Sequence, residues 1–340
     1  MFLTNYLTLK SAIYFGAFIL TAFVLIRCAS VGMSEPTGSL DRPVAVELDS
    51  AYYRVQLGKH LFYDPILSRD STVSCATCHK QELAFTDGLP KSIGIRDRMV
   101  TRNSPTLTNV GNRTIFLLDG VNPSLEAQVG VPIQEHNEFD FHILLVIDRV
   151  NNVPKYADWA QKGYGSEVTD WVLKNSIATF ERTLISDNSP YDKFLDGNYA
   201  ALDNRQKKGM ELFFETLYCS ECHSGRDFTE DRLTNNGLYE AYADSGRMRL
   251  TETEADRAIF KVPTLRNVAV TAPYMHDGSI KTLEEVIKHY ESGGHPHPGK
   301  GKEIVPFELT NEERLNLVRF LEALTDEDFL TNPDYRIETD

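Results

Sequence analysis

The pentapeptide CATCH occupies residues 75–79, and a second pentapeptide of the same form, CSECH, occupies residues 219–223. The pattern C-x-x-C-H is typical of covalent attachment of a c-type heme. Two thiols at this spacing can reach the two vinyl groups of one ring, and the histidine that follows can reach the iron. A zinc site would gather four cysteines together, whereas each pair here has its own histidine. The sequence therefore predicts two independent heme c sites.

The predicted attachment residues are Cys75, Cys78 and His79 for heme 1, and Cys219, Cys222 and His223 for heme 2. We expect His79 and His223 to be the proximal iron ligands, because a histidine is a common axial ligand of heme iron. The chain has one further cysteine, Cys28, which belongs to neither motif.

The N-terminus reads as an export signal. Lys10 precedes an apolar run at 11–26 that is shorter than the ~20 residues of a membrane-spanning helix. Cleavage would remove residues 1–32. Two alternatives stay open: lipidation at Cys28, or a retained leader that tethers the chain to a membrane. Each alternative predicts an exported, periplasmic protein, which also suits covalent heme attachment.

The surface charge is predicted to be acidic. The chain has 35 Lys and Arg against 49 Asp and Glu, a net charge of −14. This balance argues against nucleic acid as a partner. It would attract a basic protein partner, although acidity also serves solubility.

An internal repeat follows the two heme motifs at one constant offset. The matched pairs are PTLTNV (105–110) with PTLRNV (263–268), Asp119-Gly120 with Asp277-Gly278, and SLEAQV (124–129) with TLEEVI (282–287). Such a repeat indicates one structural module used twice. At this offset Leu118 matches His276, and Pro132 matches Tyr290. Pro132 cannot bind iron, whereas Tyr290 can.

Together with VPTLRNVAVTAPYMHDGS (262–279) and QVGVPIQEHNE (128–138), these motifs resemble the bacterial di-heme cytochrome c peroxidase family, including its MauG-like branch, over residues 45–335. The resemblance implies a mostly α fold with two cytochrome c-like domains in tandem, each with one covalently bound c-type heme. It implies an N-terminal peroxidatic domain at 45–190 and a C-terminal electron-transfer domain at 191–340.

Three stretches have the helical spacing that such a fold requires: 202–216, 279–292 and 311–324. The first is opened by an aspartate, and the second begins at a polar cap and ends at Gly293-Gly294. No run of alternating residues indicates a prominent strand.

The resemblance implies that Gln128, Pro132 and Glu138 line the open face of heme 1. A carboxylate in an apolar pocket has a raised pKa, which suits it to move the protons of peroxide. Glu138 is therefore the expected acid–base residue, with His136 as its rival. Gln128 is expected to hydrogen-bond peroxide or its water, and Pro132 to keep ligands off the iron.

Many family members bind heme 1 through a second histidine in the resting state. The matching position here is Ile95, which cannot bind iron. We therefore expect heme 1 to be five-coordinate, or to bind only water, without prior reduction. His136 or His142 could take the place of the missing histidine.

The sixth position of heme 2 is assigned by the resemblance to Tyr290. Many peroxidases of the family have methionine there, and the MauG-like branch has tyrosine. Met275, His276 and His289 are nearby alternatives. A thioether ligand raises the potential of the iron, and a phenolate is expected to lower it.

A calcium site between the domains is also implied by the resemblance. Its expected ligands are the side-chain oxygen of Asn103 and the backbone carbonyls of Thr271 and Pro273. Carbonyl and amide oxygens are ligands that calcium prefers.

Two departures from the family pattern bear on function. Leu118 stands where many members have a tryptophan between the hemes, which puts stepwise electron transfer there in doubt. Leu217 stands where MauG-like protein oxidases have a surface tryptophan, and Tyr218 lies beside it.

Three functions are weighed. The leading one is a peroxidase that reduces hydrogen peroxide to water with electrons from a small redox protein, a cytochrome c or a cupredoxin. The second is a MauG-like enzyme that uses peroxide to oxidise residues of a partner protein. The third is a non-catalytic di-heme electron carrier. The family often forms homodimers, so a homodimer is one expected assembly.

Overall fold

The computed structural model describes residues 49–337. The leader expected at 1–32, and with it Cys28, lies outside the described residues. In the described part the helices are α1 Ser50–Tyr63, α2 Cys75–Cys78, α3 Leu125–Gln134, α4 Ile143–Asn151, α5 Pro154–Tyr164, α6 Asp170–Glu181, α7 Pro190–Leu195, α8 Asn204–Glu211, α9 Met248–Thr251, α10 Leu283–Glu291, α11 Asn311–Glu322 and α12 Glu327–Thr331. The predicted mostly α architecture is confirmed.

One small sheet accompanies these helices in the described part of the chain. The strands β1 Leu233–Thr234 and β2 Phe260–Lys261 pair antiparallel, with Leu233 opposite Lys261 and Thr234 opposite Phe260. Neither strand is long enough for an alternating pattern to be visible in the sequence.

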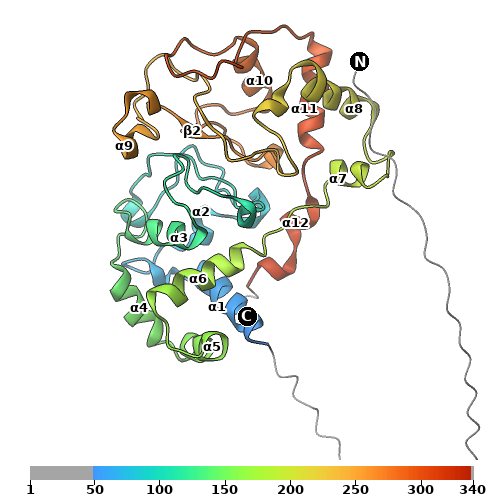
Figure 1. The fold of residues 1–340 in the computed structure, drawn as a ribbon. Coiled ribbons are helices and arrows are strands. Elements are labelled where there is room, and N and C mark those ends of the chain that lie inside the picture. Colours follow the sequence, from blue (N-terminus) through green and yellow to red (C-terminus); the bar gives the residue numbers. More distant parts are fainter. Residues whose placement is uncertain (1–48, 338–340) are drawn as a thin grey trace, which may run out of the picture. The chain divides into compact units, whose positions relative to one another are not determined.

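The first helices pack around one hydrophobic cluster. Helix α1 packs against both α5 and α6, which lie beside it in Figure 1. A Cβ atom at Gly58 on α1 would lie only 1.8 Å from the Ser176 carbonyl oxygen on α6, so glycine permits this helix crossing. Residues from α12 and beyond, Phe329, Leu330 and Tyr335, join the same cluster. The last described residues therefore pack against the first helices of the described part.

A second hydrophobic cluster is built by α8, α10 and α11. Phe213, Phe228 and Phe320 form its aromatic centre, with ring centroids 5.3–6.3 Å apart. A Cβ at Gly209 on α8 would lie 2.0 Å from the Asn316 carbonyl oxygen on α11. Gly58 and Gly209 each open one of the similar stretches GKHLF and GMELF, so both halves of the chain use the same close crossing.

The repeat seen in the sequence is also present in the backbone. Matched residues adopt left-handed conformations: Asn109 (φ 52°) and Asn267 (φ 59°), Leu117 (φ 64°) and Met275 (φ 75°), Gly120 and Gly278 (both φ 67°). Isolated antiparallel bridges also match, with Phe116 opposite Asn122 and Tyr274 opposite Ile280. One loop conformation is therefore used twice, each time before the helix that follows, α3 or α10.

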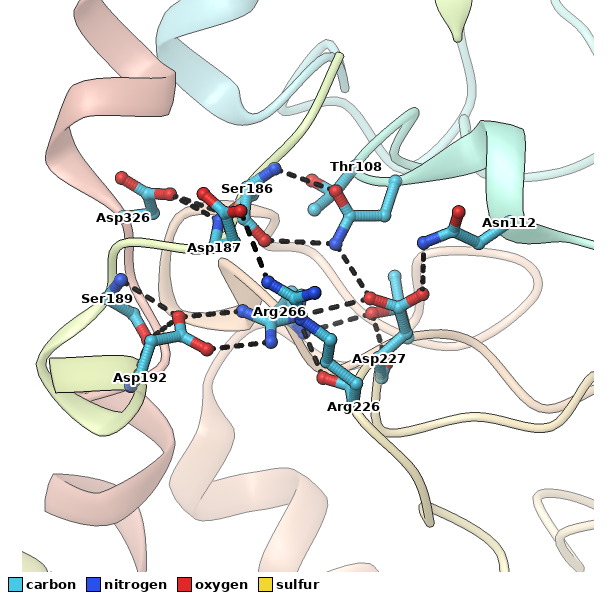
Figure 2. Close-up of polar contacts among 12 residues, drawn as sticks. Thr108, Asn112, Ser186, Asp187, Ser189, Asp192, Arg226, Asp227, Arg266 and Asp326 are labelled. Atoms are coloured by element: carbon cyan, nitrogen blue, oxygen red, sulfur yellow. Dashed lines mark hydrogen bonds and ion pairs between the residues drawn. The ribbon is translucent and has the colours of Figure 1, made fainter. Parts of the chain in front are cut away.

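A buried polar network joins residues far apart in the sequence (Figure 2). Arg266 forms two 2.9 Å hydrogen bonds to the Asp192 carboxylate and lies 3.2 Å from Asp227. The Asp227 carboxylate also accepts hydrogen bonds from Asn109 (2.7 Å) and Asn112 (3.0 Å). Because a buried charge without partners is costly, these contacts hold the loop at 109–112 to the second half of the chain.

The predicted helices are found with adjusted boundaries. Asp203 caps α8, which continues as one π-helical turn at Leu212–Thr216. The helix expected to begin at 279 begins instead at Leu283, capped by Thr282, because the preceding residues belong to the repeated loop. The helix expected at 311–324 is α11. No helix in 49–337 combines the length and apolar character of a membrane span.

Candidate heme sites

The heme 1 motif opens onto a cavity of about 700 Å³. The cavity is lined by every heme 1 residue singled out from the sequence: Cys75, Cys78, His79, Gln128, Pro132 and Glu138. Residues from α2, α3 and the loop after α3 thus meet at one site. Apolar side chains such as Val129, Ile133 and Phe139 complete much of the wall, as a porphyrin ring would require.

His79 is oriented by its own loop. Helix α2 is a single turn, and the His79 backbone N–H donates to the Cys75 carbonyl oxygen at 2.9 Å. The His79 Nδ1 lies 2.7 Å from the Phe85 carbonyl oxygen. Because a carbonyl only accepts, Nδ1 carries the proton and Nε2 keeps its lone pair. Burial lowers the pKa of His79, so the ring is neutral and suited to bind iron.

The four cysteines of the two motifs form no disulfide bond. Burial raises the pKa of Cys78 to about 11 and that of Cys219 to about 11, and it also raises the pKa of Cys75 and Cys222. These thiols are therefore not reactive thiolates at neutral pH. They fit the donor set that two thioether bonds to a heme ring need.

Glu138 lies in the turn that follows α3, after the last helical residue Gln134 and the C-cap Glu135. Its N–H donates to the Glu135 carbonyl oxygen at 3.0 Å, and the next N–H, of Phe139, donates to the Pro132 carbonyl oxygen at 3.1 Å. Burial, with a smaller contribution from Glu135, raises the pKa of Glu138 to about 7. A carboxyl group with this pKa can both accept and donate a proton near neutral pH.

Pro132 stands inside α3, where proline is unusual. It has no N–H to give to the carbonyl of Gln128, four residues earlier. Pro132 thus presents to the cavity a side chain that neither binds iron nor donates a hydrogen bond. Gln128 lines the same cavity, and its side-chain amide can both donate and accept hydrogen bonds.

A second buried carboxyl group of this cavity, Glu181, was missed in the sequence. Glu181 is the last residue of α6, and its side chain is 5% exposed. Its Oε2 is buried without a hydrogen-bond partner, and burial raises its pKa to about 8. A glutamate on the apolar face of the helix pattern in SIATFERTL (176–184) was the signal that could have found it.

The rival residues lie away from the heme 1 cavity. The His136 side chain is 67% exposed and lies near Asp140. His142 caps α4 by accepting from the Leu144 N–H at 3.3 Å. Neither histidine lines the cavity. Ile95 is fully buried, and its N–H donates to the Glu138 carbonyl oxygen at 2.9 Å. The position matched to the missing histidine therefore supports the loop that carries Glu138.

The heme 2 motif opens onto a cavity of about 510 Å³ lined by Cys219, Cys222, His223 and Tyr290. The His223 Nδ1 lies 3.1 Å from the Phe228 carbonyl oxygen, which repeats the arrangement at His79. Burial lowers the pKa of His223 to about 4. This histidine is therefore also neutral, with Nε2 free for iron.

Tyr290 reaches the heme 2 cavity from α10, and burial raises the pKa of its phenol to about 12. The alternative ligands of heme 2 that the sequence offered have other contacts. The Met275 sulfur, though in the cavity wall, lies 3.2 Å from the Asn236 side-chain nitrogen. The His289 Nε2 lies 3.0 Å from the Asn236 carbonyl oxygen, and His289 does not line the cavity. The His276 ring stacks on Phe260 at 4.3 Å.

The two cavities share part of their walls. The residues that line both are Asn103, Ser104, Pro105, Leu107, Leu117, Leu118, Gln128 and His276. Leu118 and His276, matched by the repeat, thus both lie between the cavities. Neither tryptophan of the chain lines a cavity, since Trp159 packs on His60 and Trp171 is 59% exposed.

Of the residues expected to bind calcium, Asn103 belongs to this shared wall. Asn103, Thr271 and Pro273 all line the heme 2 cavity. The Asn103 amide nitrogen donates to the Leu89 carbonyl oxygen at 2.8 Å, which turns its side-chain oxygen away from that contact. Within residues 49–337, that oxygen and the carbonyl oxygens of Thr271 and Pro273 accept no hydrogen bond. Each of them is an oxygen of the kind that calcium prefers.

The paired motifs, neutral histidines and adjoining cavities define a protein built to hold two hemes, with a carboxyl group and an amide at the first. A family model described as di-haem cytochrome c peroxidase matches residues 53–200. The methylamine utilization protein MauG of Methylorubrum extorquens is 40% identical over 275 residues, covering 80% of this chain and 78% of that protein.

Two further similarities agree. The cytochrome c551 peroxidase of Nitrosomonas europaea is 33% identical over 287 residues, covering 83% of this chain and 81% of that protein. The crystal structure of a MauG-like protein associated with microbial copper homeostasis matches with a TM-score of 0.78 and 32% identity, covering 89% of this chain and 96% of that one.

The chain belongs to the di-haem cytochrome c peroxidase family, as its motifs predicted. It is an oxidoreductase of the peroxidase class, and the family implies two c-type hemes.

Proposed function

We propose that the chain reduces hydrogen peroxide to water at heme 1, with electrons that a small redox protein delivers through heme 2. On this proposal residues 45–190 form the peroxidatic domain and residues 191–340 the electron-transfer domain. The observation that carries it is Glu138, a carboxyl group with a pKa raised to about 7 that shares one cavity with His79 and Gln128.

Each heme, when bound, supplies iron that exchanges electrons one at a time. His79 and His223 would hold the irons through Nε2, and the four thiols would hold the rings. Glu138 as a carboxylate takes a proton from one oxygen of peroxide and, as the acid, gives it to the other. Reduction consumes two electrons and two protons for each peroxide and yields two waters.

The other cavity residues prepare the substrate site. Gln128 orients peroxide or its water through a hydrogen bond. Pro132 leaves space on the open side of heme 1, because it offers no group that binds iron. On the other half of the chain Tyr290 would be the sixth ligand of heme 2. Asn103, Thr271 and Pro273 would hold calcium, which would tie the loops between the two cavities.

A second candidate function is oxidation of a partner protein by peroxide, as a MauG-like enzyme. Two observations favour it. Tyr290 lines the heme 2 cavity where the MauG-like branch has tyrosine, and Tyr218 is 59% exposed while it lines the same cavity. Leu217 beside it is not readily oxidised. A carrier without catalysis is the weakest reading, because it gives no role to Glu138 and Gln128.

The setting of the proposed peroxidase follows from its sequence. An exported chain would work in the periplasm and meet a soluble donor there, a small cytochrome c or a cupredoxin. Its acidic surface, with a net charge of −14, would attract a donor with a basic face. A homodimer is the assembly expected from the family.

The test is peroxide-dependent oxidation of a reduced small cytochrome c by the holoprotein, comparing wild type, Glu138→Gln and the exposed control Glu167→Gln. The proposal expects turnover that collapses only in Glu138→Gln. If peroxide is consumed without oxidation of the cytochrome, and a long-lived oxidised heme pair remains, the MauG-like function is favoured instead.

A further inference from the structure

The wall shared by the two cavities contains no readily oxidised side chain. Leucine, proline, serine, asparagine and glutamine make up most of it, and its one aromatic ring is that of His276. An electron that passes from heme 2 to heme 1 would therefore need to tunnel through this wall in one step. A side chain that can give up an electron nearby would divide that step into two shorter ones.

Tyr239 lies next to this wall and lines the heme 1 cavity. Its hydroxyl donates to the Asp277 Oδ2 at 2.7 Å, and Asp277 lines the same cavity. A phenol gives up an electron far more readily when its proton can move at the same time to a base. The carboxylate of Asp277 is such a base, at hydrogen-bond distance.

Asp277 is held in the ionised form. Although burial acts in the opposite direction, hydrogen bonds from Tyr239 and Ser279 leave the pKa of Asp277 below its ordinary value. The Ser279 N–H donates to the other carboxylate oxygen at 3.1 Å. The Asp277 Oδ2 is therefore the oxygen that can accept the proton of Tyr239.

Tyr239 is also in reach of the heme 2 side. Its ring centroid lies 6.4 Å from that of His276, which lines both cavities and stacks on Phe260 in the heme 2 wall. Tyr242, the neighbouring tyrosine, has its ring centroid 5.5 Å from that of Tyr239. The Tyr242 hydroxyl accepts from the Leu238 N–H at 2.7 Å and lies 3.2 Å from the Asn235 side-chain oxygen. An amide is a poor proton acceptor, so Tyr242 lacks what Tyr239 has.

We propose that Tyr239, paired with Asp277, is an oxidisable stepping stone for electrons that pass from heme 2 to heme 1. The inference rests on the proposed function, with hydrogen peroxide as the oxidant. Tyr239 gives one electron to the heme 1 site oxidised by peroxide. Its O–H bond breaks, the proton passes to the Asp277 Oδ2, and a neutral phenoxyl radical faces a neutral carboxylic acid. One electron from the heme 2 side then reduces the radical, and the proton returns.

The first readout is the radical itself. Diferric holoprotein is mixed with hydrogen peroxide in the absence of donor, frozen rapidly and examined by electron paramagnetic resonance. Wild type is expected to show a tyrosyl signal that narrows when the protein is made with ring-deuterated tyrosine. Tyr239→Phe is expected to lose the signal. Asp277→Asn is expected to show a signal weaker by about tenfold or more, because the tyrosine proton then has no carboxylate to accept it. Tyr242→Phe is the matched control and is expected to retain the signal.

The second readout is the rate at which reduced heme 2 re-reduces heme 1 after peroxide addition, followed by rapid-mixing absorbance. This rate is expected to fall about tenfold or more in Tyr239→Phe. Heme content and the absorbance of both hemes establish that each variant has folded. As a further control, Tyr156→Phe removes a phenol that donates to the Asp64 carboxylate and lines neither cavity.

The outcomes separate the two proposals. A heme 1 absorbance that does not respond to peroxide in wild type defeats the peroxidase function itself. A full heme response, with an unchanged transfer rate in Tyr239→Phe and no tyrosyl signal assignable to Tyr239, overturns only the stepping stone. A signal lost in Tyr242→Phe but kept in Tyr239→Phe overturns the assignment as well.

Discussion

Pro132 on α3 and Tyr290 on α10 occupy equivalent places in the two halves of the chain. Each stands in the helix that follows the repeated Asp-Gly loop, and each lines the cavity of its own heme motif. One fold thus presents a side chain that cannot bind iron to the first cavity and a phenol to the second. On the proposed function, the difference between an open heme 1 and a six-coordinate heme 2 would depend on this pair.

Replacement of the phenol should therefore affect one heme only. In Tyr290→Phe the electron paramagnetic resonance signal of ferric heme 2 is expected to change, because the sixth ligand is lost, while the heme 1 signal stays the same. Tyr199→Phe, whose phenol is 69% exposed, is the control. Identical spectra for Tyr290→Phe and wild type would reject ligation by Tyr290.

Heme 1 should be open in the resting protein. With Pro132 facing its cavity, and with Ile95, His136 and His142 unable to reach it, diferric protein is expected to show one high-spin heme. Pro132→His should convert that heme to low spin, since it places an imidazole where Tyr290 stands in the other half. Two low-spin signals in wild type would contradict the prediction.

The pH dependence of peroxide reduction should follow Glu138. Its pKa is raised to about 7, so the carboxylate that accepts a proton from peroxide is lost as the pH falls through 7. The second-order rate constant for peroxide is therefore expected to rise through pH 7 and level off above it. Glu138→Gln should lower the plateau by about 10²–10⁴-fold and abolish the titration. A wild-type profile that persists in Glu138→Gln would assign the titration to another group.

Glu181 should make stability depend on pH. Its folded-state pKa, about 8, is above the ordinary 4.5. A group raised in this way contributes its full stability below pH 4.5 and loses it as the pH rises through 8. Chemical denaturation should show a smaller decline between pH 5 and pH 8 for Glu181→Gln than for wild type. At pH 8 the variant should be more stable by roughly 1–3 kcal/mol, since no carboxylate is left buried without a partner. An equal decline in both proteins would exclude Glu181 as its source.

Calcium removal should loosen the loops between the cavities. Treatment of the holoprotein with a calcium chelator is expected to lower its melting temperature, because the folded state alone offers the three oxygens as a site. Asn103→Ala should melt at the lower temperature and should not respond to the chelator. A chelator effect of the same size in both proteins would place calcium elsewhere.

Much of the heme chemistry could be predicted from the sequence because it is locally encoded. Both C-x-x-C-H motifs combine thiols and histidine within one turn, and the stretch from Gln128 to Glu138 is a helix end with its following loop. The constant offset of the repeat matches Tyr290 with Pro132, and the family resemblance assigns Tyr290 to heme 2 and Gln128 and Glu138 to heme 1. The motifs that carry this resemblance are continuous stretches of the chain, which the sequence displays directly.

Residues that meet only through tertiary packing could not be predicted. Glu181 stands out in the sequence as a glutamate on an apolar helix face, but only tertiary packing turns that face toward the heme 1 cavity. Tyr239 and Asp277 likewise meet only in the folded chain. The return of Phe329 and Tyr335 to the first hydrophobic cluster also leaves no local pattern. The late start of α10, at Leu283, has a different cause. The residues before it have helical spacing in the sequence but belong to the repeated loop in the structure.

The buried network around Arg266 has a consequence for the history of the chain. If the two halves arose by copying one module, each would once have stood alone. In the present chain the Asp227 carboxylate accepts hydrogen bonds from Asn109 and Asn112 of the first half. A second half expressed by itself would leave the Asp227 carboxylate without these two donors, so its folding is expected to depend on the first half.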